Sequence, residues 1–329
     1  MALLNIADAA KRGNSQAVIN AIESGAPVDL QQLLRKVMQD FRTIRKSPGH
    51  DELAEYLLNA GAKPQREMAY EAARGGHARL IEVLLKHGLK QDLFVAAALG
   101  DAEQVKQLLS EDSAAVTECD SQRMTPLHYG CASSVWRVSP ALQQSHPAVT
   151  LLLLEAGAAF DAPAAYYGLD GVTPLFCVAW TGGNEEIARQ LLARGAQITP
   201  NILLAAVGHF QRHGDGNYAI AEQLLDHGFD VNAGEDRTAL HVFAAHEDAR
   251  GVAWLLAHGA NVEACDVAGN TPLIAAARRN AGTRVIQQLL DAGADDTATN
   301  EQGETALAAA QAAGKRKTAE LLKAIATDQ

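Results

Sequence analysis

The sequence predicts an all-α repeat solenoid, made of stacked helix–turn–helix units. A Leu-Leu-x-x-Gly segment recurs along the chain, and from Gly195 onward its glycines follow one another at intervals of 33, 31 and 34 residues. A Thr-Pro-Leu or Thr-Ala-Leu segment precedes five of the units. Two separate motifs that recur in phase indicate a repeat protein, in which each unit covers the apolar face of its neighbour.

Each motif marks one end of a helix. A threonine hydroxyl before proline caps the free N–H groups of a first turn, where proline loses no hydrogen bond. A leucine pair followed by glycine marks a helix end, because glycine supplies the left-handed cap. Alanine-rich runs such as 274–277 allow neighbouring helices to approach closely. Each unit is therefore expected to hold two short helices.

Composition restricts the class of protein. The chain has 329 residues, of which 48% are hydrophobic, and its formal net charge is −11. These values are typical of a folded protein rather than a disordered one. No apolar run approaches the ~18 residues of a membrane span, and the first residues do not resemble a secretory signal. The four cysteines form no CxxC pair, which favours reduced thiols and a cytoplasmic location. We expect a monomer that spans no membrane and binds no nucleic acid.

Several segments resemble a known repeat family. Three of them, TPLHYGCA from Thr125, RTALHVFAA from Arg237 and GNTPLIAAA from Gly269, resemble the first helix of the ankyrin repeat. GFDVNA and GANVEACD, which begin at Gly228 and Gly259, resemble its finger. The resemblance covers essentially the whole chain and implies a single domain, residues 1–329, of about ten ankyrin repeats with short β-hairpin fingers between the helix pairs. It also implies that His128 and His241 make local hydrogen bonds that hold turn to helix.

The chain departs from the repeat pattern at defined places. Residues 1–110 read as degenerate repeats that are poor in fingers, whereas residues 111–329 are closer to the family pattern. The second part carries an insertion at 134–144 and a long finger at 159–172. Leu30 to Lys46 and Pro200 to His213 read as lengthened inner helices. We expect function to lie at these departures.

Family resemblance also implies where a partner would bind. Ankyrin arrays usually bind proteins with their fingers and with the inner-helix residues that face the concave groove. Trp180 is notable because a large aromatic residue in the groove adds little to the solenoid core, although packing on the insertion is an alternative. Trp136 of the insertion either contacts a partner or pins that loop to the groove. The candidate partner-binding residues are Trp180, Thr181, Trp136, Tyr166, Tyr167, Phe210, Arg212, His246, Arg278, Arg279, Arg42, Arg45 and Arg74.

Catalytic motifs are absent from the sequence. There is no HExxH, GxSxG, GxxxxGK[ST] or GxGxxG motif, so we expect neither an enzyme nor a cofactor. His209 and His213 are spaced i, i+4, which suits Zn²⁺, but no cysteine pair completes four ligands. An exposed polar helix face is the alternative interpretation.

Two function classes remain after these exclusions. The favoured one is a non-catalytic protein–protein interaction module, either an adaptor (scaffold) or an inhibitor, that holds its partner in the concave groove and with its fingers. The other class is a small-ligand or metal-binding sensor, or an enzyme, that uses the groove near His209 and His213. Ankyrin repeats explain how binding occurs and reveal almost nothing about the identity of the partner.

Overall fold

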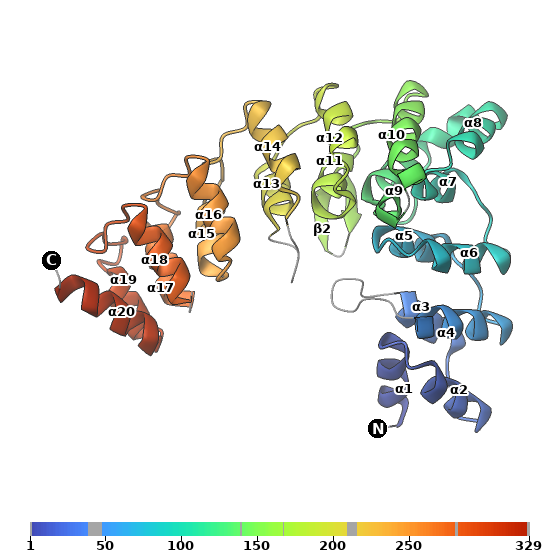
Figure 1. Ribbon diagram of the computed structural model, residues 1–329, viewed down its shortest axis with the longest axis horizontal. Helices are drawn as coiled ribbons and strands as arrows, with labels where there is room; N and C mark the ends of the chain where they lie inside the picture. The colour runs from blue at the N-terminus through green and yellow to red at the C-terminus, as the bar shows by residue number, and fades with distance from the viewer. Residues whose placement is uncertain are drawn as a thin grey trace. The chain divides into compact units, whose positions relative to one another are not determined.

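A computed structural model describes residues 2–38, 48–138, 140–166, 168–208, 216–279 and 282–327. The chain divides into two compact units, Met1–Gln197 and Ile198–Gln329. Each unit consists of helices in successive antiparallel pairs (Figure 1). No described helix has the length and the apolar content that crossing a membrane would require.

The first unit contains six helix pairs among its described residues. Its pairs are α1 Ala2–Lys11 with α2 Ser15–Glu23, α3 Leu30–Met38 with α4 Pro48–Asn59, α5 Arg66–Arg74 with α6 Ala78–Lys86, α7 Leu93–Leu99 with α8 Ala102–Glu111, α9 Pro126–Ala132 with α10 Pro140–Glu155, and α11 Pro174–Cys177 with α12 Glu185–Leu192. Helix α11 continues directly into the π-helical turn η3, Val178–Gly182. The short 3-10 helices η1, Ser113–Thr117, and η2, Val135–Val138, lie in the connections.

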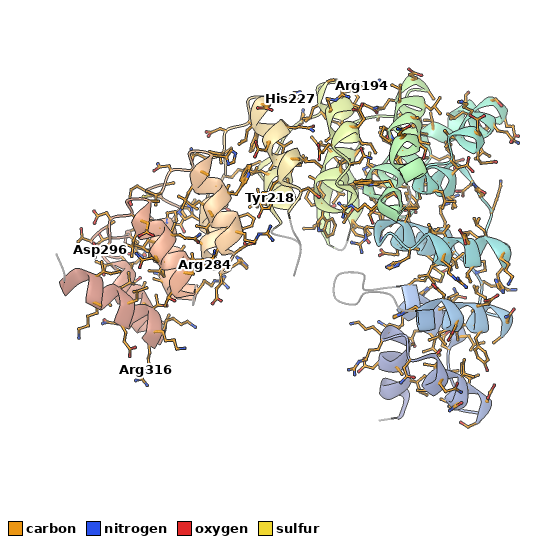
Figure 2. All side chains as sticks on the ribbon, viewed as in Figure 1. Arg194, Tyr218, His227, Arg284, Asp296 and Arg316 are labelled. Carbon is orange, nitrogen blue, oxygen red and sulfur yellow. The ribbon has the colours of Figure 1, made fainter. Side chains whose placement is uncertain are left out.

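The second unit contains four helix pairs among its described residues. They are α13 Pro200–Val207 with α14 Tyr218–Asp226, α15 Ala239–Ala245 with α16 Ala249–Ala257, α17 Pro272–Arg279 with α18 Thr283–Asp291, and α19 Ala306–Ala312 with α20 Arg316–Thr327. Arg284 and Arg316, labelled in Figure 2, are exposed residues near the starts of α18 and α20. The prediction of about ten stacked helix pairs agrees with the two units taken together.

Threonine starts the inner helices in the way the motif predicts. The Thr125 N–H donates to His128 Nδ1 at 3.1 Å, and His128 Nε2 donates to the Val172 carbonyl at 3.0 Å. Thr238 and His241 repeat the first bond at 3.3 Å. Burial lowers the pKa of His128 to about 4, so its ring is neutral at pH 7 and joins the helix to the next finger.

Glycine ends the outer helices in the left-handed conformation. This region of φ is unfavourable for residues with a Cβ atom, which explains the recurrence of glycine after the leucine pair. The φ angles are 111° at Gly61, 93° at Gly88, 97° at Gly157, 85° at Gly195, 83° at Gly228, 83° at Gly259 and 92° at Gly293.

Helices of like position pack in two layers within each unit. In the first unit α3 packs on α5, α5 on α7 and α7 on α9, and α10 packs on α12 in the other layer. In the second unit α15 packs on α17 and α17 on α19. Small residues permit this approach: Ala96, Ala97 and Ala98 of α7 are completely buried, as are Ala276 and Ala277 of α17.

The long finger forms a β-hairpin. Strands β1, Ala164–Tyr166, and β2, Leu169–Val172, pair antiparallel with Ala164 opposite Val172. Gly168 lies between the strands with φ of 78°, a conformation that glycine adopts without strain. The Ala165 N–H donates to the Gln122 carbonyl at 2.8 Å, so the long finger is tied to the finger before it.

The insertion at 134–144 lies partly in η2 and partly in the first turns of α10. It is anchored on α5: the Ser134 N–H donates to the Ala73 carbonyl at 2.9 Å, and Ser134 Oγ donates to the Arg74 carbonyl at 2.7 Å. The insertion therefore covers the end of a helix about 60 residues earlier in the chain.

One prediction about helix length was wrong. A continuous inner helix from Pro200 to His213 was expected, but α13 ends at Val207 because Gly208 adopts the left-handed conformation, with φ of 110°. For the other predicted long helix, Leu30 to Lys46, the described part is α3, which ends at Met38. Residues 39–47 and 209–215 lie outside the described residues.

Candidate functional site

A buried arginine lies at the centre of the first unit. Arg74, in the last turn of α5, is 7% exposed, and its Nη2 lies 2.9 Å from Glu71 Oε2. Its guanidinium lies over the rings of Tyr166 at 5.4 Å and Trp180 at 5.5 Å. Burial by itself would lower the pKa of Arg74, but the adjacent Glu71 carboxylate outweighs burial and raises it. The arginine is therefore charged at any physiological pH.

Tyr166 carries the long finger onto this arginine. Its hydroxyl donates to Glu71 Oε1, a contact between residues 95 positions apart in the chain. Its ring, which is 3% exposed, meets Tyr70 edge-on at 5.4 Å and Trp180 at 5.9 Å. The connection between α6, which ends at Lys86, and α7, which begins at Leu93, is short. The finger that contacts α5 is the long finger from further along the chain, through Tyr166.

Trp180 lies inside the same cluster, on η3. It is 3% exposed and also contacts Phe176 edge-on, with a centroid separation of 5.6 Å. Neighbouring Thr181 is part-buried, and its Oγ1 donates to the Ala132 carbonyl at 3.0 Å. Trp180 thus packs against Arg74, Tyr166 and Phe176 and has little exposed surface, and its contact with a partner stays a prediction.

Trp136 fastens the insertion to the end of η3. Its Nε1 donates to the Gly182 carbonyl at 2.9 Å, and the Arg137 guanidinium lies 5.3 Å from the centre of its ring. The indole is half-buried. This geometry agrees with the second interpretation, in which Trp136 pins the loop, and it leaves part of the ring open.

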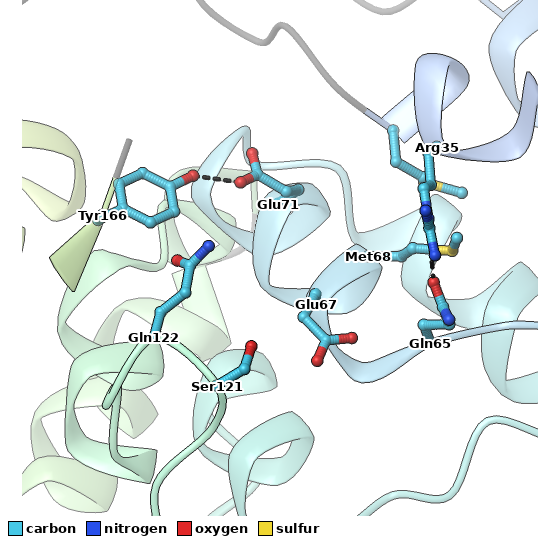
Figure 3. Close-up of a pocket in the computed structure, with 9 residues that line it drawn as sticks. Arg35, Gln65, Glu67, Met68, Glu71, Ser121, Gln122 and Tyr166 are labelled. Atoms are coloured by element: carbon cyan, nitrogen blue, oxygen red, sulfur yellow. Dashed lines mark hydrogen bonds between the residues drawn. The ribbon is translucent and has the colours of Figure 1, made fainter. Parts of the chain in front are cut away.

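An open pocket of about 360 Å³ borders the cluster (Figure 3). Its lining comes from α3, from α5 and its preceding turn, from the finger before α9, and from β1. The lining residues are Arg35, Met38, Gln65, Glu67, Met68, Glu71, Ser121, Gln122 and Tyr166. Segments that are distant in sequence thus present polar side chains around one opening.

The polar side chains of the pocket differ in whether they already form hydrogen bonds within the chain. Arg35 Nε donates to Gln65 Oε1 at 3.3 Å, and Glu71 holds the Tyr166 hydroxyl, as Figure 3 shows. The Glu67 carboxylate is exposed, and within the described part of the chain it has neither an ion pair nor a hydrogen bond. The pocket therefore offers a free acceptor beside a fixed one.

Comparison with known proteins identifies the repeat. A family model described as "Ankyrin repeats (3 copies)" matches residues 93–202 and 203–300, which is more than half of the chain. The chain belongs to the ankyrin repeat family. Ankyrin repeat domains generally mediate protein–protein interactions and are generally not enzymes.

Individual relatives agree with this assignment. The chain is similar to a transient receptor potential cation channel subfamily A member 1 homolog of Caenorhabditis elegans, 26% identical over an alignment of 242 residues that covers 68% of this chain and 18% of that protein. It is also similar to the neurogenic locus notch homolog protein 1 of Xenopus tropicalis, 33% identical over an alignment of 162 residues that covers 43% of this chain and 6% of that protein. The chain thus spans under a fifth of either relative.

Solved ankyrin repeat domains resemble the fold. The human ASB11 ankyrin repeat domain superposes with a TM-score of 0.53 and 28% identity, covering 71% of this chain and 96% of that one. The ankyrin repeat domain of Bcl-3, a member of the IκB family, superposes with a TM-score of 0.52 and 23% identity, covering 72% of this chain and 99% of that one. The second likeness concerns the fold alone.

Other candidate residues of the ankyrin array lie elsewhere. His246 caps the end of α15, where its Nδ1 bonds the Val242 carbonyl at 2.8 Å, and Arg278 pairs with Glu304. Arg279 is exposed at the end of α17. These three belong to the second unit. The candidates Tyr167, Phe210, Arg212, Arg42 and Arg45 lie outside the described residues.

Two of the cysteine thiols, Cys131 and Cys177, are buried. Burial raises the pKa of the Cys131 thiol and raises that of Cys177 to about 12, so both are neutral at pH 7. Among the residues that the structure describes, no group of three or more His, Cys, Asp or Glu side chains is placed to hold a metal ion. His209 and His213 lie outside those residues.

Sequence reasoning missed most of the pocket. Arg35, Glu67, Glu71, Ser121 and Gln122 were not among the candidates. Glu67 and Glu71 are four positions apart, which places both on one helix face. Ser121 and Gln122 sit at a finger tip, where ankyrin repeats are known to bind. Those two patterns could have pointed to the pocket, but their convergence depends on the long finger.

Proposed function

We propose that this chain is a non-catalytic binding module, an adaptor or an inhibitor, that holds a partner protein on the inner-helix and finger surface of its first unit. The observation that carries the proposal is the pocket beside Tyr166, where side chains from α3, α5 and two fingers surround one opening. A plain repeat array places such side chains one repeat apart. Here the long finger and the insertion are both anchored on α5.

Burial determines which residues would contact the partner. The large side chains Arg74, Tyr166 and Trp180 are 7% exposed or less and form the rigid support. Exposed Glu67 and the finger-tip residues Ser121 and Gln122 would make the contacts. Binding sites of high affinity combine such a fixed base with free polar groups at the rim.

The cellular location and the oligomeric state are also part of the proposal. We keep the cytoplasmic location predicted from the cysteine pattern, together with the expected monomeric state. The identity of the partner defines whether the chain acts as an adaptor or as an inhibitor.

The test is capture of a partner from the native source with paired charge variants. Glu67→Lys changes an exposed pocket residue, and Glu82→Lys makes the same charge change on exposed Glu82 of the outer helix α6. We expect Glu67→Lys to weaken the affinity for the captured protein by about tenfold or more, because a rim charge is inverted. Glu82→Lys should bind like the unmodified chain.

Two results would contradict the proposal. Equal loss of affinity in both variants would indicate a general charge effect, and equal retention would place the binding surface away from this pocket. Circular dichroism of each variant shows whether the helical content is unchanged, so that a loss of binding is not mistaken for unfolding.

A further inference from the structure

Two carboxylates of α5 face the pocket in different states. Glu71 is fixed, because Oε1 accepts from the Tyr166 hydroxyl and Oε2 from Arg74 Nη2 at 2.9 Å. Glu67, one turn earlier on the same helix face, is exposed and has no ion pair or hydrogen bond in the described ranges. Arg74 neutralises the charge of Glu71, whereas Glu67 has no ion-pair partner among the residues that the structure describes.

Two neutral polar side chains, each able to donate or to accept a hydrogen bond, line the same opening as this carboxylate. Gln122 and Ser121 belong to the finger before α9, and both are exposed at its tip. Neither side chain forms a hydrogen bond within the part of the chain that the structure describes. Figure 3 shows them on the side of the pocket opposite Arg35 and Gln65. A carboxylate, a carboxamide and a hydroxyl thus border the same space.

The rest of the lining is apolar or already occupied. Met38 and Met68, which are 1% and 3% exposed, form the closed floor of the pocket. Arg35, the positive charge of the lining, is held at the rim by Gln65. The volume of about 360 Å³ is near the lower end of the roughly 300–1,000 Å³ typical of ligand pockets. It suits one side chain rather than a folded element.

We propose that this pocket receives an arginine side chain of the partner protein. The proposal rests on the proposed function, since it requires that a partner bind to this face. A guanidinium has five N–H donors in one plane, so it can bond the Glu67 carboxylate with two of them and reach Gln122 and Ser121 with others. A lysine ammonium has three donors at one point and matches acceptors on both walls less well.

Methionine methyl groups provide a direct readout of this binding. The chain has four methionines, so a spectrum of protein labelled with ¹³C-methyl methionine resolves Met38 and Met68 beside Met1 and Met124. Met124 is buried and does not line the pocket, which makes it an internal control. The probe is N-acetyl-arginine methylamide, and its comparison is N-acetyl-citrulline methylamide, which has the same shape and no charge.

We expect the arginine probe to shift Met38 and Met68 at millimolar concentration while Met124 stays in place. The citrulline probe should bind about tenfold more weakly, as should the arginine probe to a Glu67→Gln variant, because each loses a charged hydrogen bond. A Glu82→Gln variant on the outer helix should bind like the unmodified chain. Glu67 is exposed, so its replacement by glutamine does not disturb the core.

Three outcomes would overturn the assignment: no shift of Met38 or Met68, equal affinity for the two probes, or an affinity unchanged in Glu67→Gln. If a captured partner nevertheless loses affinity for Glu67→Lys, the proposed function stands and only the arginine assignment falls. If partner binding is also insensitive to that change, both proposals fail together.

Discussion

The repeats from α5 to α11 and those from α15 to α19 are built from the same kind of helix pair, but different contacts hold them together. In the second region the contacts between fingers join neighbouring repeats: Asn300 Nδ2 donates to Asn270 Oδ1 at 2.9 Å, 30 positions away. In the first region the Tyr166 hydroxyl reaches Glu71 across 95 positions. The core there contains a buried ion pair among aromatic rings, whereas the other region uses amide side chains and alanine.

This difference shows how little sequence is needed to change a repeat array locally. A few added residues in the finger at 159–172 and an insertion at 134–144 cover α5 from later repeats. The entropic cost of closing a longer loop grows slowly, by roughly 0.6 kcal/mol for each doubling of its length. Burial of Tyr166 and Trp180 readily exceeds that cost. The modified region thereby gains a pocket.

The largest expected effect compares the two ion pairs. Arg74→Ala should lower the free energy of unfolding by about 4 kcal/mol, because it leaves the mostly buried Glu71 carboxylate without its cation. Arg278→Ala should cost less than about 1 kcal/mol, since the Arg278 and Glu304 side chains are 45% and 35% exposed. Urea denaturation followed by circular dichroism measures both. Losses of equal size would show that the buried pair has no special role.

The next effect concerns the pH dependence of stability and the two histidines that are bonded to helix-starting threonines, His128 and His241. Burial lowers the folded-state pKa of His128 to about 4, and that of His241 less deeply. Because the pKa of the ring is lower in the folded chain, the unfolded chain binds the proton at a higher pH as the pH falls. The contribution of His128 to stability is therefore present above pH 6.5 and is lost as the pH falls toward 4, by about 3 kcal/mol in all.

Nuclear magnetic resonance titration of the two imidazole rings tests this order directly. We expect His128 to titrate at lower pH than His241, and the urea midpoint to fall as the pH is lowered from 6.5 to 4.5. A His128 ring that titrates near its ordinary pKa while the protein remains folded would contradict the buried, neutral ring.

The smallest effect compares two indole hydrogen bonds. Trp136→Phe removes the 2.9 Å bond to the Gly182 carbonyl and should cost about 1 kcal/mol. Trp254→Phe should cost less, because the bond from its Nε1 to Glu222 is 3.4 Å long and exposed. Thermal unfolding of both variants gives the difference. A greater loss from Trp254→Phe would mean that the insertion is not held by Trp136.

Much of the fold was determined by the sequence alone. The helix starts at Thr125 and Thr238 and the seven glycine ends depend on residues within a few positions of each other, so local pattern was enough to predict them. The long finger was also predicted, from its excess length against the repeat. The prediction failed at Gly208, whose left-handed conformation ends α13 inside the segment that was expected to be one helix.

The candidate site was decided by tertiary structure. Sequence reasoning chose Trp180 as a groove residue by its position in the repeat, but its exposure depends on whether Tyr166 covers it, and no pattern within one repeat contains that contact. Glu67 and Gln122 become neighbours of one pocket only because two fingers close over α5. Repeat motifs encode the contacts between adjacent units, and contacts that skip units arise from packing of the whole array. The sequence therefore determined the helix pairs of this ankyrin repeat protein, and long-range burial determined its pocket.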